Sequence, residues 1–223
     1  METSGLIYGL YRFCVWTMKL FATNILWLLF NIPIAYLSFN LILSKTPQHL
    51  QINFITLAAL APFIFFPATT ALFGVIRKWV TGESDIPLVR SFVKYYKDNY
   101  IRSMTIGFII VPLWGVLIVD YFYFSNANSP LFYVFLLIGM FMFVFTFHLF
   151  SNTVHVHLKY FNAFKNSMLL TIGRPVHTIG IAVANAGILY VCFNVFPPLI
   201  LLGMGTLIAF TSFYLYYKSH SYD

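Results

Sequence analysis

The chain has 223 residues, of which 60% are hydrophobic and only 9% are charged, and its formal net charge is +7. Soluble domains typically contain about 45–50% apolar and about 25% charged residues, so this composition excludes a large soluble core. The length suits roughly six membrane spans of about 20 residues each, with no stretch left over for a second domain. The sequence therefore predicts an all-α, polytopic membrane helical bundle that forms a single domain.

The first predicted span, at about residues 20–43, follows a segment of residues 5–18 that suits a helix at the membrane interface. The span carries three polar side chains at seven-residue spacing, which places them on one helical face: Asn24, Asn31 and Ser38. Such a stripe is typical of hydrogen bonds between transmembrane helices. The functional alternative is a stripe that lines a path for a solute.

The second predicted span, at about residues 52–76, contains Pro62 and Pro67. Proline inside a transmembrane helix kinks it and frees carbonyl groups that neighbouring groups must satisfy. We therefore expect a bent second span. Thr69 and Thr70 follow the second proline and are suited to that task.

A basic amphipathic helix is predicted between the second and third spans, on the cytoplasmic side. Acidic residues precede Pro87 there, which is typical of a helix start. Beyond it, apolar residues share one helical face and cations share another. The simpler interpretation is a helix on lipid headgroups, and the alternative is a docking surface for a partner protein. The docking cations are predicted to be Arg77, Lys78, Arg90, Lys94 and Lys97.

Four further spans complete the predicted bundle. They lie at about residues 103–124, 131–150, 176–196 and 198–217, with a second amphipathic stretch after the fourth. No charged residue occurs between Arg174 and Lys218, and this apolar stretch is long enough for two spans. The last two segments either both cross the membrane or form a re-entrant hairpin.

The positions of the basic residues predict the orientation. With six spans, twelve of the thirteen Lys and Arg residues fall on the side that holds both termini, and Lys45 alone falls on the other. Because basic loops stay in the cytoplasm, both termini are predicted to be cytoplasmic. The basic excess thus needs no nucleic-acid partner, which would require a basic face on a soluble module.

Few residues are candidates for chemistry. Asp120 is the only acid within a predicted span, which makes it a functional candidate, although an anchor near the membrane surface explains it more simply. His148 and His155 share a helical face and are weak metal candidates, since the sequence places no third ligand beside them. Motifs for nucleotide hydrolysis or nucleophilic catalysis are absent. We therefore expect no catalytic residues, no metal and no cofactor.

Three stretches of the sequence carry a resemblance. They are the opening segment with Trp16 and K-L-F-A-T-N-I-L-W-L-L-F (Lys19–Phe30), the box F-F-P-A-T-T-A-L-F (Phe65–Phe73), and R-K-W-V-T-G-E-S-D-I-P (Arg77–Pro87). Together they resemble the YesL-like family of bacterial integral membrane proteins, a domain family of unknown function. The resemblance implies a multi-pass protein of the bacterial inner membrane with no established catalytic residues.

Members of that family are often encoded beside carbohydrate importers of the ATP-driven class. The resemblance therefore implies a non-enzymatic accessory subunit that contacts the lipid bilayer and acts with a carbohydrate ABC importer or its sensing system. The alternative is a small solute transporter or channel in its own right, lined by the polar stripe. No particular oligomeric state is predicted.

Overall fold

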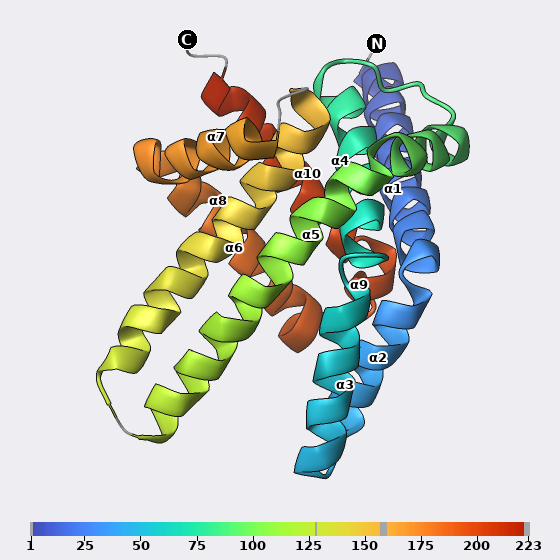
Figure 1. The fold of residues 1–223 in the computed structure, drawn as a ribbon. Helices are drawn as coiled ribbons and strands as arrows, with labels where there is room; N and C mark the ends of the chain where they lie inside the picture. Colours follow the sequence, from blue (N-terminus) through green and yellow to red (C-terminus); the bar gives the residue numbers. More distant parts are fainter. Residues whose placement is uncertain (1, 128, 157–159, 221–223) are drawn as a thin grey trace.

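The computed structural model describes residues 2–127, 129–156 and 160–220, and every regular element in these ranges is a helix (Figure 1). The predicted all-α fold is confirmed. The elements in chain order are α1 (Glu2–Phe30), α2 (Ile32–Leu43), α3 (Pro47–Leu60), α4 (Phe65–Val80), α5 (Leu88–Asn126), α6 (Leu131–His155), α7 (Tyr160–Gly173), α8 (Pro175–Tyr190), the π-helical turn η1 (Val191–Val195), α9 (Leu199–Leu202) and α10 (Met204–His220).

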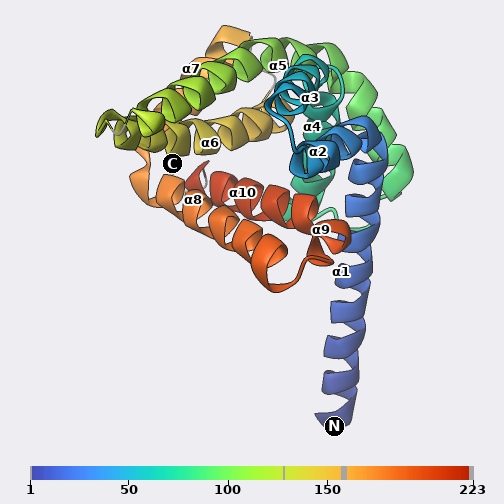
Figure 2. The same ribbon diagram turned by 90° about the horizontal axis from the view of Figure 1, so that it is seen from below.

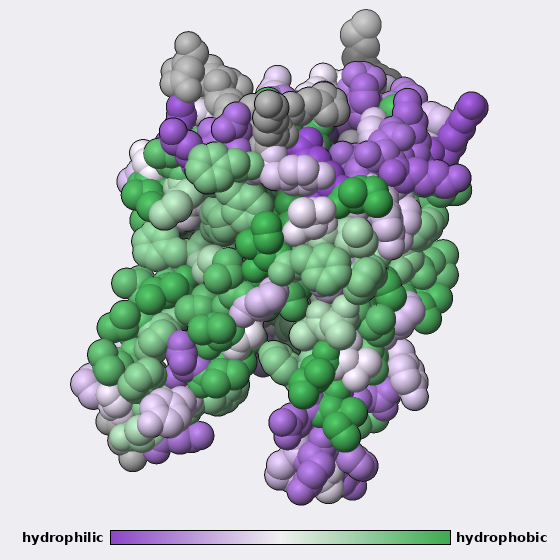
Figure 3. Space-filling model, viewed as in Figure 1, coloured by the Kyte–Doolittle hydropathy of each residue, from purple (hydrophilic) through white to green (hydrophobic). Residues whose placement is uncertain are grey.

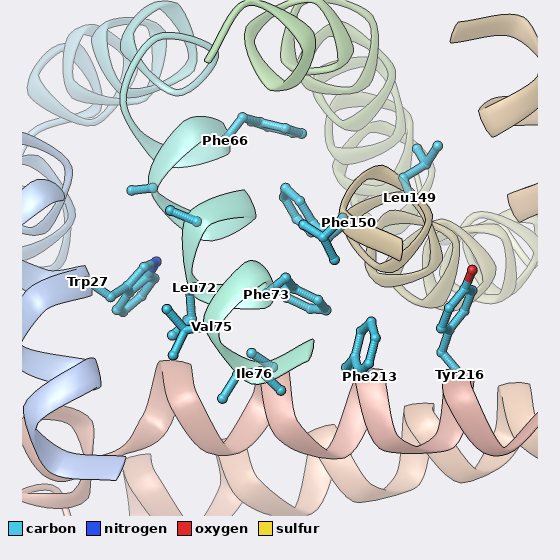
Figure 4. Packing of buried hydrophobic residues seen from close by; sticks show 14 of the residues in the cluster. Trp27, Phe66, Leu72, Phe73, Val75, Ile76, Leu149, Phe150, Phe213 and Tyr216 are labelled. Carbon is cyan, nitrogen blue, oxygen red and sulfur yellow. The ribbon is translucent and has the colours of Figure 1, made fainter. Parts of the chain in front are cut away.

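Helix α4 forms the centre of the bundle. Every residue from Phe66 to Ile76 is buried, and α1, α5, α6 and α10 all pack against this helix (Figure 4). A helix that is apolar on all sides buries every face only when other helices enclose it. The F-F-P-A-T-T-A-L-F box forms the first half of α4, so this sequence signature lies in the core.

Aromatic rings connect α4 to α6. The ring centroid of Phe150 lies 5.3 Å from that of Phe66 and 5.4 Å from that of Phe73, and Phe147 stacks on Phe73 at 6.3 Å. Aromatic pairs at such distances contribute about 0.5–1.5 kcal/mol each beyond the burial of their area. Rings from α6 therefore pack on α4 at two positions that lie two turns apart.

The predicted bend in the second span is confirmed, because α3 and α4 meet at 53°. Pro62 lies in the break between them, whereas Pro67 lies in the first turn of α4. A proline in a first turn lacks only an N–H that would have had no partner within the helix. Pro67 therefore fits within α4 without a kink, and the bend is at Pro62.

Two predicted boundaries differ from the helices. Helix α5 runs unbroken for 39 residues through both the basic amphipathic segment and the third span, and it curves along its length (Figure 1). The sequence between these two segments contains no glycine or proline to end the helix. In contrast, the first predicted span is interrupted at Asn31, because Pro33 cannot donate to the carbonyl four residues earlier and clashes with it.

The N-terminal segment is continuous with the first span. Helix α1 runs through residues 5–18 into the span without a break, and Figure 2 shows this part of the helix projecting from the rest of the bundle. The side chains of Tyr8, Tyr11 and Phe13 are exposed there. An exposed helix of this composition suits the membrane interface better than water.

The bundle has two polar ends with an apolar belt between them. The start of α1, the end of α10, the α4–α5 loop and α7 lie at one end, and the α2–α3 and α5–α6 turns lie at the other (Figure 1). Figure 3 shows hydrophilic residues at both ends and hydrophobic residues between them. Lys45 lies in the α2–α3 turn, opposite the end where the α4–α5 loop carries its charges.

Within the described residues, four helices are long and apolar enough to cross a membrane: Ile7–Phe30, α5, α6 and Pro175–Val195. Counting the bent α3–α4 pair as one span raises the number to five. The sequence predicted about six. The last predicted segment, residues 198–217, is divided between the short α9 and the 17-residue α10.

The close contact between α5 and the α3–α4 break generates a prediction. A Cβ at Gly107 would lie 2.8 Å from the Cα of Pro62, whereas a Cβ at Gly115, two turns further along α5, would meet nothing within 4 Å. We expect Gly107→Ala to destabilise the protein by about 1–3 kcal/mol, as overpacking does. Gly115→Ala is the matched control and should cause no loss, since alanine favours helix. Thermal unfolding in mild detergent measures both, and equal midpoints would contradict the predicted close contact.

Candidate functional site at the basic end of the bundle

The first half of α5 presents its cations outward. Arg90, Lys94 and Lys97 are exposed, while Phe92 on the same helix is fully buried. The rings of Phe92 and Tyr96 lie 5.1 and 4.9 Å from that of Phe30 on α1. The apolar face of the predicted amphipathic helix therefore packs on the bundle itself. The two salt bridges found in the described residues use none of the three cations, which form a row on the surface.

The other two predicted docking cations, Arg77 and Lys78, make contacts with other residues of the chain. Arg77 is half-buried and donates from Nη1 to the carbonyl oxygen of Val154 at 2.6 Å. Lys78 pairs with Glu83 at 2.7 Å. Arg77 therefore has a structural role in the last turn of α6, which its sequence position beside Lys78 did not reveal.

Arg102 makes the same kind of contact. Its guanidinium donates to the carbonyl oxygens of Thr153 and Val156, each at 3.4 Å. Two arginines from α4 and α5 thus meet the C-terminal end of α6, where the helix dipole and the free carbonyls favour positive charge. No local sequence pattern predicts this contact, because the carbonyls lie 51 to 77 residues away from the arginines.

A second cluster joins α1 to the α4–α5 loop. Lys19 Nζ lies 2.8 Å from Asp85 Oδ1 and donates to the Ser84 carbonyl at 3.0 Å. The same ammonium lies 5.7 Å from the ring centroid of Trp16, whose ring meets Trp79 edge-on at 5.6 Å. The opening segment and the R-K-W-V-T-G-E-S-D-I-P segment, both of which carry the family resemblance, therefore meet here.

A hollow of about 310 Å³ lies beside this cluster. Its walls carry both signs of charge and several aromatic rings, which suits polar ligands of the headgroup region. The lining residues are Tyr8, Tyr11, Arg12, Val15, Trp16, Lys19, Ser84 and Asp85.

The polar stripe does not form a continuous surface. Asn24 is fully buried, donates to the carbonyls of Ile200 and Leu201 at 3.1 and 2.7 Å, and accepts from the amides of Gly205 and Thr206 at 3.0 and 3.3 Å. Asn31 is buried at the α1–α2 break and donates to the Trp27 carbonyl at 2.8 Å.

Ser38, the third member of the stripe, lines a separate cleft of about 330 Å³ between the α2–α3 and α5–α6 hairpins. The other walls of this cleft are almost entirely apolar. The stripe thus divides among two helix breaks and one cleft, as expected if its first members serve contacts between helices.

The two histidines lie beside α10. His148 is buried, with its ring centroid 5.9 Å from that of Tyr216, and His155 lies 5.9 Å from the same ring. Nowhere in the described residues do three His, Cys, Asp or Glu side chains gather as a metal site requires. Asp120 is half-buried near the outer end of α5, and neither salt bridge in those residues joins it to Lys45.

A buried amide, Asn152, lies beside the histidines on α6. Asn152 Oδ1 accepts from Tyr216 Oη at 2.6 Å and from Asn166 Nδ2 at 3.0 Å, and Asn152 Nδ2 donates to Ser167 Oγ at 2.6 Å. These bonds connect α6, α7 and α10. A buried polar group that is hydrogen-bonded through both its oxygen and its nitrogen stabilises and specifies packing.

The helices and the polar ends define a polytopic α-helical membrane protein. Residues 20–121 match the family described as "Protein of unknown function, DUF624". The chain is 29% identical to uncharacterized protein YteU of Bacillus subtilis over 182 residues, which cover 80% of this chain and 71% of YteU. It is 28% identical to uncharacterized protein YesL of the same organism, over 81% of this chain and 75% of YesL.

The chain is therefore similar to the YesL-like family of uncharacterised proteins, and the resemblance predicted from its sequence is confirmed. No solved structure matches it.

The arginine contacts with α6 predict unequal effects for two neighbouring cations. Arg77→Gln removes a charged donor from a carbonyl of α6, and hydrogen bonds to charged groups contribute about 1.5–3 kcal/mol. Lys78→Gln removes a surface pair, which contributes about 0.2–1 kcal/mol. Unfolding in mild detergent should show the larger loss for Arg77→Gln. A larger loss for Lys78→Gln would refute the structural role of Arg77.

The Lys19–Asp85 contact predicts a shifted titration. The hydrogen bond and the charge of Lys19 hold the pKa of Asp85 below its usual value of 3.8. Because the folded-state pKa is the lower one, the contribution of the pair is complete above the unfolded pKa and is lost as the pH falls through the folded pKa. Carboxyl ¹³C NMR should show the pKa of Asp85 rising toward 3.8 in Lys19→Met. An unchanged titration in that variant would contradict the contact.

Proposed function

We propose that this protein is a non-enzymatic accessory subunit of the bacterial inner membrane, with both termini in the cytoplasm, that binds a subunit of a carbohydrate ABC importer. The cation row of Arg90, Lys94 and Lys97 is the proposed docking surface. The observation that carries the proposal is that this row is exposed on a helix whose opposite face is already buried. The resemblance to YesL-like proteins, often encoded beside such importers, suggests the class of partner.

The rigidity of the row supports docking. The row belongs to a 39-residue helix, and Phe92 and Tyr96 fix its first half on α1. A surface held in one conformation loses little entropy when a partner binds. Exposed cations on such a surface attract an acidic partner and orient it, an effect that weakens as salt rises.

A transport path for sugars has less support. A hydrophilic solute needs polar groups that are free to bind it. Both Nδ2 and Oδ1 of Asn24 are already hydrogen-bonded to backbone groups of α9 and α10. The cleft that contains Ser38 is lined mainly by aliphatic and aromatic side chains. Apolar walls of this kind cannot replace the hydrogen bonds that a sugar makes with water.

The docking proposal predicts a specific cross-link. A photo-reactive amino acid in place of Lys94 should capture an importer subunit when cells with native membranes are irradiated. Reversing the row with Arg90→Glu, Lys94→Glu and Lys97→Glu should abolish co-purification of that subunit, since a docking cation row would then repel its acidic partner. The measurement is recovery of importer subunits in mild detergent, identified by mass spectrometry.

A matched control separates the row from net charge. Lys45→Glu, Lys165→Glu and Lys218→Glu reverse three other exposed cations and change the net charge by the same amount. This variant should retain the partner. Cross-links to lipid alone, or equal loss of partner in both triple variants, would overturn the proposal.

A further inference from the structure

The hairpin formed by α8, η1, α9 and α10 ends in an apolar turn. The turn reads F-P-P-L at residues 196–199, and Val195 and Phe196 beside it are exposed. The tips of the other two hairpins read S-K-T-P-Q at residues 44–48 and S-N-A-N-S-P at residues 125–130. Polar tips suit water and headgroups, whereas a tip of phenylalanine, proline and leucine suits hydrocarbon.

The hairpin also penetrates less deeply than the other two. Figure 1 shows its turn stopping short of the level that the α2–α3 and α5–α6 tips reach. Helix α10 has 17 residues, which at 1.5 Å each give about 26 Å, less than the roughly 30 Å of a hydrocarbon core, although the other arm, Pro175–Val195, is long enough to cross. The apolar turn therefore lies between the two polar ends of the bundle.

Non-helical backbone at this depth needs partners, because hydrocarbon supplies none. Within the turn, the Phe196 amide donates to the Val191 carbonyl at 2.8 Å and the Leu199 amide to the Phe196 carbonyl at 3.0 Å. At the α9–α10 break, the buried side chain of Asn24 on α1 forms hydrogen bonds with two backbone carbonyls and two backbone amides.

Close packing makes the contact with Asn24 possible. A Cβ at Gly205 would lie 2.7 Å from the ring of Trp27, so only glycine allows α10 to approach α1 this closely without a shift. The hydroxyl of Thr206 adds a bond to the Leu20 carbonyl at 3.2 Å. The break is thus satisfied by protein groups, which is the condition for irregular backbone inside a membrane.

We infer that α8, η1, α9 and α10 form a re-entrant hairpin that enters and leaves the bilayer at the basic end and turns inside the hydrocarbon, held there by Asn24. The chain then crosses the membrane four times, through α1–α2, α3–α4, α5 and α6. Lipid of the opposite leaflet fills the space beyond the turn. This inference is independent of the proposed docking function.

Cysteine labelling in membrane vesicles tests the depth of the turn. Single cysteines replace Val195 in the turn, Asn126 at the end of α5 and Lys97 on the basic row, in a chain that carries Cys14→Ser and Cys192→Ala. A membrane-impermeant maleimide is added to vesicles of each orientation. We expect Asn126→Cys and Lys97→Cys to be labelled from opposite sides. Val195→Cys should be labelled from neither side and should become labelled in detergent, because residue 195 is 64% exposed on the protein.

Labelling of Val195→Cys from either side of the membrane would overturn the inference. Labelling of Val195→Cys from the Asn126 side means that both segments cross the membrane, and labelling from the Lys97 side means that the turn does not enter it. A nitroxide at residue 195 gives a second readout. Its relaxation should respond to oxygen, which concentrates in hydrocarbon, and not to a water-soluble nickel complex. A response to the nickel complex equal to that at residue 126 refutes a turn inside the bilayer.

Discussion

The enclosure of α4 is the constraint on which the rest of the structure depends. Every residue between Phe66 and Ile76 is buried, so this helix needs neighbours on all sides. Helices α1, α5, α6 and α10 pack around α4, although they come from distant parts of the sequence. Water does not drive helices together inside a bilayer, and close contact between surfaces takes its place. The near approach of Gly107 to Pro62 and of Gly205 to Trp27 shows how that contact is achieved.

Breaks and ends of the surrounding helices leave backbone groups without helical partners, and buried or half-buried polar side chains bond to them. Asn24 serves the α9–α10 break, Arg77 and Arg102 serve the end of α6, and Asn31 lies at the break between α1 and α2. A backbone group without a partner costs several kcal/mol in hydrocarbon, so these side chains matter to stability. Asn24 and Asn31, which suggested a solute path in the sequence, are thus occupied at helix breaks, whereas Ser38 lines a separate cleft.

Cations at the basic end divide by burial into two groups. Arg77, Arg102 and Lys19 contact the backbone or an acid of the chain, whereas the row on α5 points outward. The division arises because α5 continues past its membrane segment as one helix that curves over the end of the bundle (Figure 1). Burial of Phe92 against Phe30 then sets which face of α5 is exposed.

The sequence by itself determined the class of this protein, its helical fold and the amphipathic character of the first half of α5. Those features follow from composition and from the 3.6-residue period, which are local. The sequence also predicted a bend in the second span, and the structure places it at Pro62. Only the tertiary structure decided that the F-F-P-A-T-T-A-L-F box forms the centre, that Arg77 binds α6 and that Asn24 holds the α9–α10 break. The physical reason is that these contacts join groups 77 to 177 residues apart, and no local pattern records which distant carbonyl lacks a partner.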